Sequence, residues 1–193
     1  MCGIIVQLPL PKILDSRKIL DAIDPNLDVD CLGAVASNKF YRGLSNGGIS
    51  FPTALACMAL LDSLNLDLKV KSIVVLGQGD LVGKPVTALL HFRGLHPTVI
   101  TRKTEDKEKL IKQADVIISG IGHGKYITGD MVKSGVVIID AGTSESNGGI
   151  SGDVDLESVR SVASYVSPVP GGVGPVTVAM LLQNVLTVAQ KLK

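Results

Sequence analysis

Residues 77–85 (GQGDLVGKP) directly follow the apolar run 72–76 (SIVVL). A glycine-rich turn between a buried strand and a helix is typical of a phosphate-binding loop, because backbone N–H groups at the helix start face the ligand. The spacing fits neither general motif. A P-loop needs one residue fewer before Gly83-Lys84 and a Ser or Thr at Pro85, and the fingerprint GxGxxG needs its third glycine one residue earlier. Alone, the turn predicts either a ligand loop or a tight connection.

Apolar runs and helical patterns alternate on both sides of this turn. We expect strands at residues 72–76, 98–101, 116–119, 136–140 and 165–168, and helices at 53–64, 84–92, 105–113, near 130–132 and at 177–192. Such alternation indicates right-handed βαβ units. The predicted fold class is therefore α/β, a Rossmann-like parallel sheet with helices on both faces.

The N-terminal segment has a different pattern. Residues 4–8 (IIVQL) indicate a buried strand that Pro9 and Pro11 end, and Ser16 is the expected cap of a short helix that ends at Asp24. Residues 28–48 are rich in Gly, Ser and Asn and are expected to form a loop.

Three glycine-rich turns follow predicted strands. They are residues 77–83, residues 120–124 (GIGHG) and residues 140–143 (DAGT). The carboxyl ends of parallel strands meet at one edge of a sheet, where ligands bind in such folds. Together the three turns predict a nucleotide site at that edge.

The end of the second strand bears on the choice of cofactor. An NAD-binding fold usually places Asp or Glu here for the ribose diol, whereas this sequence has Thr101-Arg102-Lys103. Arg102 and Lys103 could pair with a 2′-phosphate and so favour NADP. Spacing alone equally allows them to begin a solvated, charged helix.

Two further features carry polar or flexible residues in apolar surroundings. Residues 167–174 (SPVPGGVG) combine stiffening prolines with glycines that let the backbone approach a ligand, which favours a binding loop over a structural turn. Gln7 lies in an apolar strand pattern, and Asp28 and Asp30 form a DVD pair. Their simpler interpretations are a backbone contact for the amide and a turn for the aspartates.

Composition excludes several classes of function. The chain of 193 residues is 46% hydrophobic and has a net charge of +1, which gives no electrostatic reason to expect a nucleic-acid or membrane partner. No apolar run reaches the roughly 18 residues of a membrane span, and the N-terminus lacks the basic region of a signal peptide. The three cysteines and three histidines show no metal-ligand spacing. We expect reduced thiols, a cytoplasmic protein and no metal.

Several blocks of the sequence, in order, resemble the bifunctional methylenetetrahydrofolate dehydrogenase/cyclohydrolase family. The matching blocks are residues 3–11 (GIIVQLPLP), 28–30 (DVD), 52–53 (PT), 77–85, 132–142 (VKSGVVIIDAG), 152–155 (GDVD) and 168–177 (PVPGGVGPVT). The opening turn resembles the family signature GRSxxVGxP, whose longer glycine spacing accounts for the two failed motifs.

The resemblance implies an enzyme of one-carbon metabolism. It would oxidise 5,10-methylenetetrahydrofolate with NADP, hydrolyse the methenyl product to 10-formyltetrahydrofolate, and form a homodimer. Gln7 and Asp30 would be catalytic. The folate would lie against Pro170, Gly171, Gly172 and Gly174. The dinucleotide would lie against Gly77, Gln78, Gly79, Val82, Gly83, Arg102 and Thr143.

The implied organisation has three parts. Residues 1–48 would be a remnant of an α/β folate-binding catalytic domain, residues 49–166 the NAD(P)-binding domain, and residues 167–193 a folate-side loop with a C-terminal helix that packs back on the first domain.

The sequence also departs from the family pattern. The family's Tyr-x-x-x-Lys motif, upstream of VQLPLP, has no counterpart here, Cys31 replaces the glycine of DVDG, and residues 51–56 (FPTALA) replace PCTPxG. Gln78-Gly79 replaces Arg-Ser, which removes a guanidinium suited to a 2′-phosphate and leaves NAD as an alternative cofactor. The alternative function is a catalytically impaired relative that binds a nucleotide or folate. A third is an NAD-type dehydrogenase of another class, in which the PVPGGVGP block has no role.

Overall fold

A computed structural model describes residues 1–44, 49–146 and 148–191 of the chain. The chain divides into two compact units. Unit 1 comprises residues 1–52 and 178–193, and unit 2 comprises residues 53–177. The predicted domain boundary at residue 48 and the predicted helix end at residue 192 lie outside the described residues.

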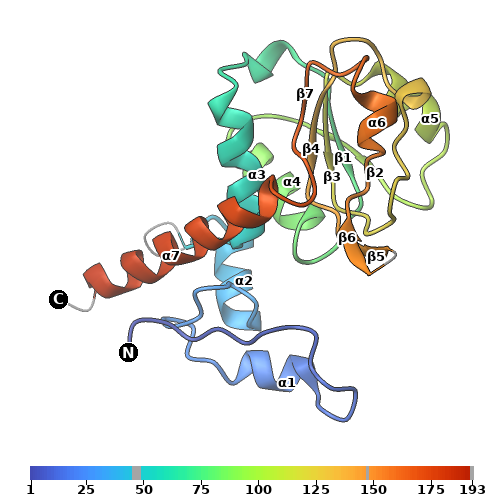
Figure 1. The fold of residues 1–193 in the computed structure, drawn as a ribbon. Helices are drawn as coiled ribbons and strands as arrows, with labels where there is room; N and C mark the ends of the chain where they lie inside the picture. Colours follow the sequence, from blue (N-terminus) through green and yellow to red (C-terminus); the bar gives the residue numbers. More distant parts are fainter. Residues whose placement is uncertain (45–48, 147, 192–193) are drawn as a thin grey trace. The chain divides into compact units, whose positions relative to one another are not determined.

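Unit 2 is built on a parallel sheet of five strands in the order β2-β1-β3-β4-β7 (Figure 1). The strands are β1 (Ile73–Leu76), β2 (Thr98–Ile100), β3 (Val116–Ser119), β4 (Val137–Asp140) and β7 (Tyr165–Val166). Every residue of β1, β3 and β4 is buried. Nearly continuous apolar strands are expected where helices cover both faces of a sheet.

The strand order places the helices. The connection from β1 to β2 runs one way along the sheet and the connection from β2 to β3 runs the other way. Right-handed crossovers therefore put α4 (Gly83–Phe92) on one face and α5 (Lys107–Gln113) on the other. The short elements η3 (Gly129–Met131) and α6 (Leu156–Val159) lie with α5 (Figure 1). The predicted Rossmann-like α/β sheet with helices on both faces is confirmed.

A long apolar helix precedes the sheet. α3 (Pro52–Ser63) matches the helix expected at residues 53–64, and its inner residues Ala54, Cys57 and Leu61 are buried. Near its end, Asp62 accepts two hydrogen bonds from Arg93, at 2.6 and 2.8 Å. Arg93 is the C-cap of α4, so this pair joins the ends of α3 and α4.

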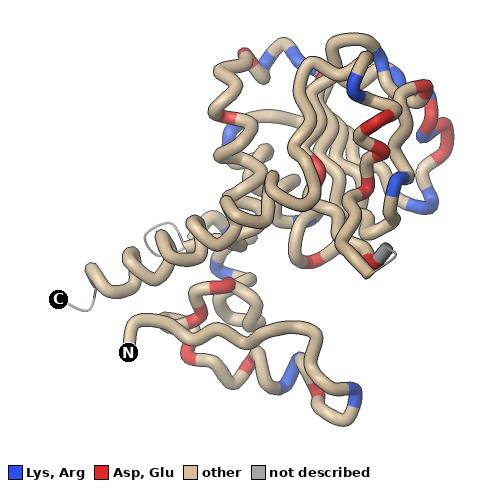
Figure 2. Tube along the Cα trace, in the orientation of Figure 1, with Lys and Arg blue, Asp and Glu red and all other residues tan. Residues whose placement is uncertain are grey.

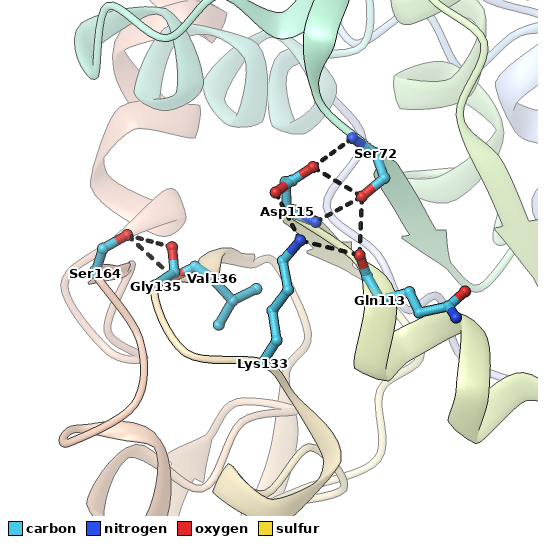
Figure 3. Close-up of polar contacts among 7 residues, drawn as sticks. All are labelled: Ser72, Gln113, Asp115, Lys133, Gly135, Val136 and Ser164. Carbon is cyan, nitrogen blue, oxygen red and sulfur yellow. Dashed lines mark hydrogen bonds and ion pairs between the residues drawn. The ribbon is translucent and has the colours of Figure 1, made fainter.

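The amino ends of the strands are joined by a polar cluster (Figure 3). Asp115, just before β3, accepts hydrogen bonds from the backbone N–H and the hydroxyl of Ser72, at 2.7 and 2.9 Å. Its other oxygen lies 2.7 Å from the Lys133 ammonium, which also donates to the carbonyl of Gln113. The hydrogen bond from Lys133, the largest effect, and those from Ser72 lower the pKa of Asp115 to about 2. These contacts join the segments before β1, β3 and β4.

Several elements of unit 2 differ from the sequence expectation, among them the unpredicted short helix η2 (Leu68–Val70). A hairpin of β5 (Ser144–Ser146) and β6 (Gly149–Ser151), together with α6, was not predicted. The last helix, α7 (Val173–Lys191), begins before the predicted start at Thr177. Pro175 lies in its first turn, where the missing N–H breaks no helical hydrogen bond, so the proline does not delay the helix.

Unit 1 contains α1 (Ser16–Asp21), α2 (Ala34–Tyr41) and the part of α7 from Val178 onward. The side chain of Asp15, rather than Ser16, caps α1 by accepting a hydrogen bond from the Lys18 N–H. The buried Asn184 of α7 donates to the carbonyls of Val29 and Ser50, both at 2.8 Å.

Two further sequence expectations for unit 1 are wrong. Residues 4–8 form no strand, because only Ile4 pairs, in an isolated bridge with Asp28. The expected loop at residues 28–48 contains α2, whose start is fixed because the buried Asp28 carboxylate accepts a 2.7 Å hydrogen bond from the N–H of Gly33, the helix cap.

Candidate functional site

The three glycine-rich turns lie at the carboxyl ends of β1, β3 and β4, which are neighbours in the sheet. Each turn begins with a hydrogen bond to an adjacent strand. Gly77 N–H donates to Ile100 (2.8 Å), Gly120 N–H to Leu76 (3.0 Å), and Ala141 N–H to Ser119 (2.8 Å). The turns are therefore direct continuations of the sheet ladder and share one edge, as the sequence predicted.

Close backbone approach explains the glycines of the first turn. Gly77 has a φ of +92°, and a side chain there would meet the carbonyl of Gly120 at 2.9 Å. At Gly83, the first residue of α4, a Cβ would lie 2.1 Å from the Gly77 carbonyl. Gly79 differs, because no atom lies within 4 Å of the position its Cβ would take. Gly77 and Gly83 shape the turn, while Gly79 leaves open space beside it.

Two other residues predicted for the cofactor site act within the turn. Val82 packs against Gly120, because its Cγ1 lies 2.7 Å from the position of a Cβ there, and so it joins the first turn to the second. The Gln78 amide donates to the carbonyl of Gly77 and to the hydroxyl of Thr87, at 3.0 and 3.1 Å. The Gln78 side chain therefore reinforces the junction between the turn and α4.

The buried carboxylate of Asp153 holds the second turn. It accepts hydrogen bonds from the Ser119 hydroxyl (2.7 Å), the Ile121 N–H (2.9 Å) and the His123 N–H (2.8 Å). Asp153 is fully buried, as is Ser119. A buried carboxylate with three donors fixes the backbone of residues 120–124 in one conformation.

Asp140 does the same for the third turn. Its carboxylate accepts hydrogen bonds from the N–H groups of Gly142 (2.9 Å), Asp153 (3.1 Å) and Val154 (2.9 Å). Burial, the largest effect, raises the pKa of Asp140 to about 6, although the backbone hydrogen bonds oppose this and nearby Asp153 adds to it. Gly142 lies against Asp153, where a Cβ would be 2.0 Å from the carboxyl carbon. Thr143, which follows, is exposed.

A cavity of about 150 Å³ opens beside the first turn. Its walls come from the ends of β1 and β2, from the second turn and from the start of α5. The lining residues are Leu76, Gly77, Ile100, Thr101, Arg102, Lys107, Ile121, His123 and Tyr126. The rings of His123 and Tyr126 form an edge-to-face pair with centroids 5.6 Å apart. An apolar cavity with aromatic and basic walls suits a base and a phosphate.

Sequence reasoning identified only part of this site. It predicted Gly77 and Arg102 but missed Lys107, His123 and Tyr126 as lining residues. The turn GIGHG was recognised, and its histidine was the available signal for a wall residue. Asp153 belongs to the GDVD block, but its role depends on contacts with residues 30 or more positions away.

The predicted folate-side loop is fixed to β4. The N–H of Ser167 donates to Ile138 (3.0 Å), and its hydroxyl accepts from the Asp140 N–H (2.7 Å). Beyond it, Pro170 and Gly171 are exposed, and Gly171 has a φ of +104°. Gly172 is buried, with a Cβ position only 2.4 Å from the Pro168 carbonyl. Gly174 lies in the first turn of α7 rather than in the loop.

The two predicted catalytic residues belong to unit 1, and all other predicted site residues belong to unit 2. Gln7 is exposed and donates to the carbonyl of Leu8 at 3.0 Å. Asp30 is half-buried, and burial, then the negative charge of Asp28, raises its pKa. The bridge between Ile4 and Asp28 joins the segments that carry Gln7 and Asp30.

Cys31 retains the backbone conformation of a glycine. It follows Asp30 with a φ of +61°, a region that residues with a side chain rarely adopt. The described residues, 1–44, 49–146 and 148–191, include no group of three or more His, Cys, Asp or Glu side chains that could hold a metal ion.

Comparison with known proteins gives consistent results. Residues 52–193 match the family model of the tetrahydrofolate dehydrogenase/cyclohydrolase NAD(P)-binding domain. "Bifunctional protein FolD" from Lactobacillus acidophilus is 42% identical over 189 residues, which cover 98% of this chain and 66% of that protein. The chain thus spans about two thirds of the length of the curated relatives it matches.

Solved structures show the same likeness. The bifunctional FolD enzyme of Campylobacter jejuni superposes with a TM-score of 0.91 at 39% identity, covering 99% of this chain and 68% of that one. The Trypanosoma brucei enzyme, solved with NADP and an inhibitor, gives a TM-score of 0.89 at 37% identity, covering 98% of this chain and 67% of that one. The sequence and the fold both match those of this family. The chain therefore belongs to the tetrahydrofolate dehydrogenase/cyclohydrolase family.

Proposed function

We propose that this chain oxidises 5,10-methylenetetrahydrofolate to the methenyl form with NADP and hydrolyses the product to 10-formyltetrahydrofolate. One observation carries the proposal: three glycine-rich turns share one edge of the sheet, Asp153 and Asp140 hold the second and third of them, and an apolar cavity with a basic wall opens beside the first two. The family membership and the names of the relatives support the choice of reaction.

The residues present fit a dinucleotide. Gly79 leaves open space beside the turn that precedes α4, and the N-cap Val82 makes no side-chain capping bond, so backbone N–H groups at this helix start can face a diphosphate. The cavity would take the adenosine half, and Arg102 would hold the 2′-phosphate. Thr143 would border the cofactor from the third turn. When bound, NADP accepts a hydride from the methylene carbon of the folate.

Gln7 and Asp30 would serve the folate. The Gln7 amide can both donate and accept, so it can orient the folate nitrogens. The raised pKa of Asp30 makes its carboxyl a better proton acceptor than an exposed aspartate. In the hydrolysis, water adds to the methenyl carbon and its bond to one folate nitrogen breaks, which leaves a formyl group on the other and releases a proton. Pro170, Gly171, Gly172 and Gly174 would border the folate.

The test is a coupled measurement on the purified chain. Methylenetetrahydrofolate and NADP are mixed with the protein, and the absorbance of reduced cofactor and of the methenyl product is followed, then repeated with NAD. Formation of NADPH and decay of the methenyl signal faster than without protein support the proposal. Absence of NADPH formation by a folded chain that binds NADP contradicts it.

The second candidate is a catalytically impaired relative that binds a nucleotide or folate. It is favoured by the contacts of Gln78, whose amide is occupied by Gly77 and by Thr87 of α4 where the family signature has an arginine. The same experiment separates the two, because this candidate predicts saturable NADP binding in calorimetry without turnover.

We also propose the organisation and surroundings of the chain. Residues 1–48 would serve the folate, residues 49–166 the dinucleotide, and residues 167–193 would return to the folate side.

The protein would be a cytoplasmic homodimer without nucleic-acid or membrane partners. By length and composition α7 is apolar enough to cross a membrane, with a mean hydropathy of 1.3, but core helices pass the same test. Light scattering of the purified chain tests the dimer, and sedimentation with lipid vesicles tests the absence of membrane binding.

A further inference from the structure

Two basic side chains, Arg102 and Lys107, line the same cavity. Arg102 follows β2, and Lys107 is the first residue of α5, a part of the chain that carries both basic and acidic residues (Figure 2). Of the described residues that line the cavity, none is acidic. Across the described ranges 1–44, 49–146 and 148–191, neither Arg102 nor Lys107 forms an ion pair with a carboxylate. The cavity therefore has two cationic groups without a protein counter-charge, an arrangement suited to an anion.

An ordered turn brings these two residues to one wall. Thr101 N–H donates to the Thr104 hydroxyl (2.9 Å), and Thr104 N–H donates back to the Thr101 carbonyl (3.2 Å). The Lys103 N–H donates to the Thr101 hydroxyl at 3.3 Å. This closed turn reverses the chain after β2, so that Arg102 within it and Lys107 after it border the same cavity. Lys103, at the turn itself, is exposed and is not a lining residue.

The side chain of Gln78 in the neighbouring turn supplies no cation to the cavity. The Gln78 amide is occupied by Gly77 and Thr87, so it adds no positive charge beside the cavity. A 2′-phosphate carries close to two negative charges, which one exposed guanidinium balances only in part. We infer that Lys107 acts with Arg102 to bind the 2′-phosphate and so sets a preference for NADP over NAD. This inference rests on the proposed dinucleotide site and assigns it a further specificity-determining residue.

The test compares two variants with the same change of charge. Lys107→Gln and Lys103→Gln each remove one positive charge from the same region, but only Lys107 lines the cavity. Calorimetry with the full chain uses two probes, 2′,5′-ADP, which carries the 2′-phosphate, and 5′-AMP, which does not. We expect Lys107→Gln to weaken binding of 2′,5′-ADP about three- to fivefold, in the upper part of the range of a partly exposed ion pair.

Three further measurements separate a contact with the 2′-phosphate from other effects of the substitution. 5′-AMP should bind Lys107→Gln and wild type within about twofold, since the contact under test is to the 2′-phosphate. Lys107→Arg should retain tight 2′,5′-ADP binding, and the loss in Lys107→Gln should shrink at high salt because screening weakens a partly exposed charge pair. Thermal unfolding of each variant verifies that it is folded.

Three results would overturn the inference. Equal losses for Lys107→Gln and Lys103→Gln would show a general effect of net charge rather than a contact. Equal losses for both probes would show damage to the cavity rather than to phosphate recognition. A wild-type chain that binds neither probe would overturn the proposed dinucleotide site and this inference with it, whereas the first two results leave the proposed function intact.

Discussion

The hydroxyl of Ser119 and the carboxylate of Asp153 lie 2.7 Å apart, and both side chains are fully buried. Ser119 is the last residue of β3, so this bond joins the sheet directly to the residue that holds the turn 120–124. Replacing a buried acceptor that has three donors is costly, because each donor would then be buried with neither a protein partner nor water.

We predict that Asp153→Asn destabilises the chain by about 3 kcal/mol, because the amide NH₂ group would face backbone donors. Urea unfolding measures the change. Ser119→Ala, which removes one donor and leaves the turn contacts in place, should cost about 1 kcal/mol. A larger loss for Ser119→Ala than for Asp153→Asn would contradict this account of the turn.

Gly83 and Gly79 lie in the same turn but should respond oppositely to alanine. At Gly83 the new Cβ would lie 2.1 Å from the backbone carbonyl of Gly77, so Gly83→Ala should cost more than about 2 kcal/mol of folding stability. Gly79→Ala meets no atom within 4 Å and should leave stability within about 0.5 kcal/mol. Its methyl group enters the space proposed for the diphosphate, so NADP binding should weaken. Urea unfolding and NADP titration of both variants check the contrast.

The polar cluster of Figure 3 predicts a dependence of stability on pH. The pKa of Asp115 is lowered from 3.8 to about 2 in the folded chain, so the unfolded chain binds its proton first as pH falls. The stabilising contribution of Asp115 is therefore complete above pH 3.8 and lost as pH falls toward 2. The difference in unfolding free energy between wild type and Asp115→Asn should be largest near neutral pH and shrink across this window. A difference that stays constant with pH would refute the prediction.

The three cysteines should differ in reactivity. Cys2 is exposed, whereas Cys31 and Cys57 are buried. Burial, the largest cause, raises the pKa of both buried thiols to about 12, so they hold almost no thiolate at neutral pH. In native buffer a disulfide reagent should label one thiol rapidly, and mass spectrometry should place it at Cys2. Labelling of Cys31 or Cys57 should require denaturant, and rapid labelling of either in the native chain would contradict the structure.

The sheet was predictable from sequence because its central strands β1, β3 and β4 are short apolar runs, each followed by a glycine-rich turn. The run at residues 4–8 has the same composition but forms no strand, since a strand also needs a neighbour to pair with, which composition does not reveal. α2 was missed because the Gly, Ser and Asn residues of the segment 28–48 indicated a loop. The helix is fixed by tertiary contacts, namely the buried Asp28 carboxylate at its start and the buried Phe40 near its end.

The candidate site was predictable where local sequence dictates geometry. Gly77 and Gly83 are required by backbone contacts within or next to their own turn, and the glycine pattern revealed them. Lys107 was read only as part of a charged helix, because its place at the cavity depends on the Thr101–Thr104 hydrogen bonds that reverse the chain. Residues that act through tertiary contacts leave little local signature.

The buried pair of Asp140 and Asp153 has a consequence for the energetics of ligand binding. Because folding alone orders the second and third turns, their backbone entropy is lost before any ligand arrives, and binding does not have to supply that ordering. Variants that weaken this bracing would then bind with a larger entropic penalty even where every ligand-contacting residue is retained. In this chain, the affinity of the cofactor edge is thus partly determined by two carboxylates buried beneath it.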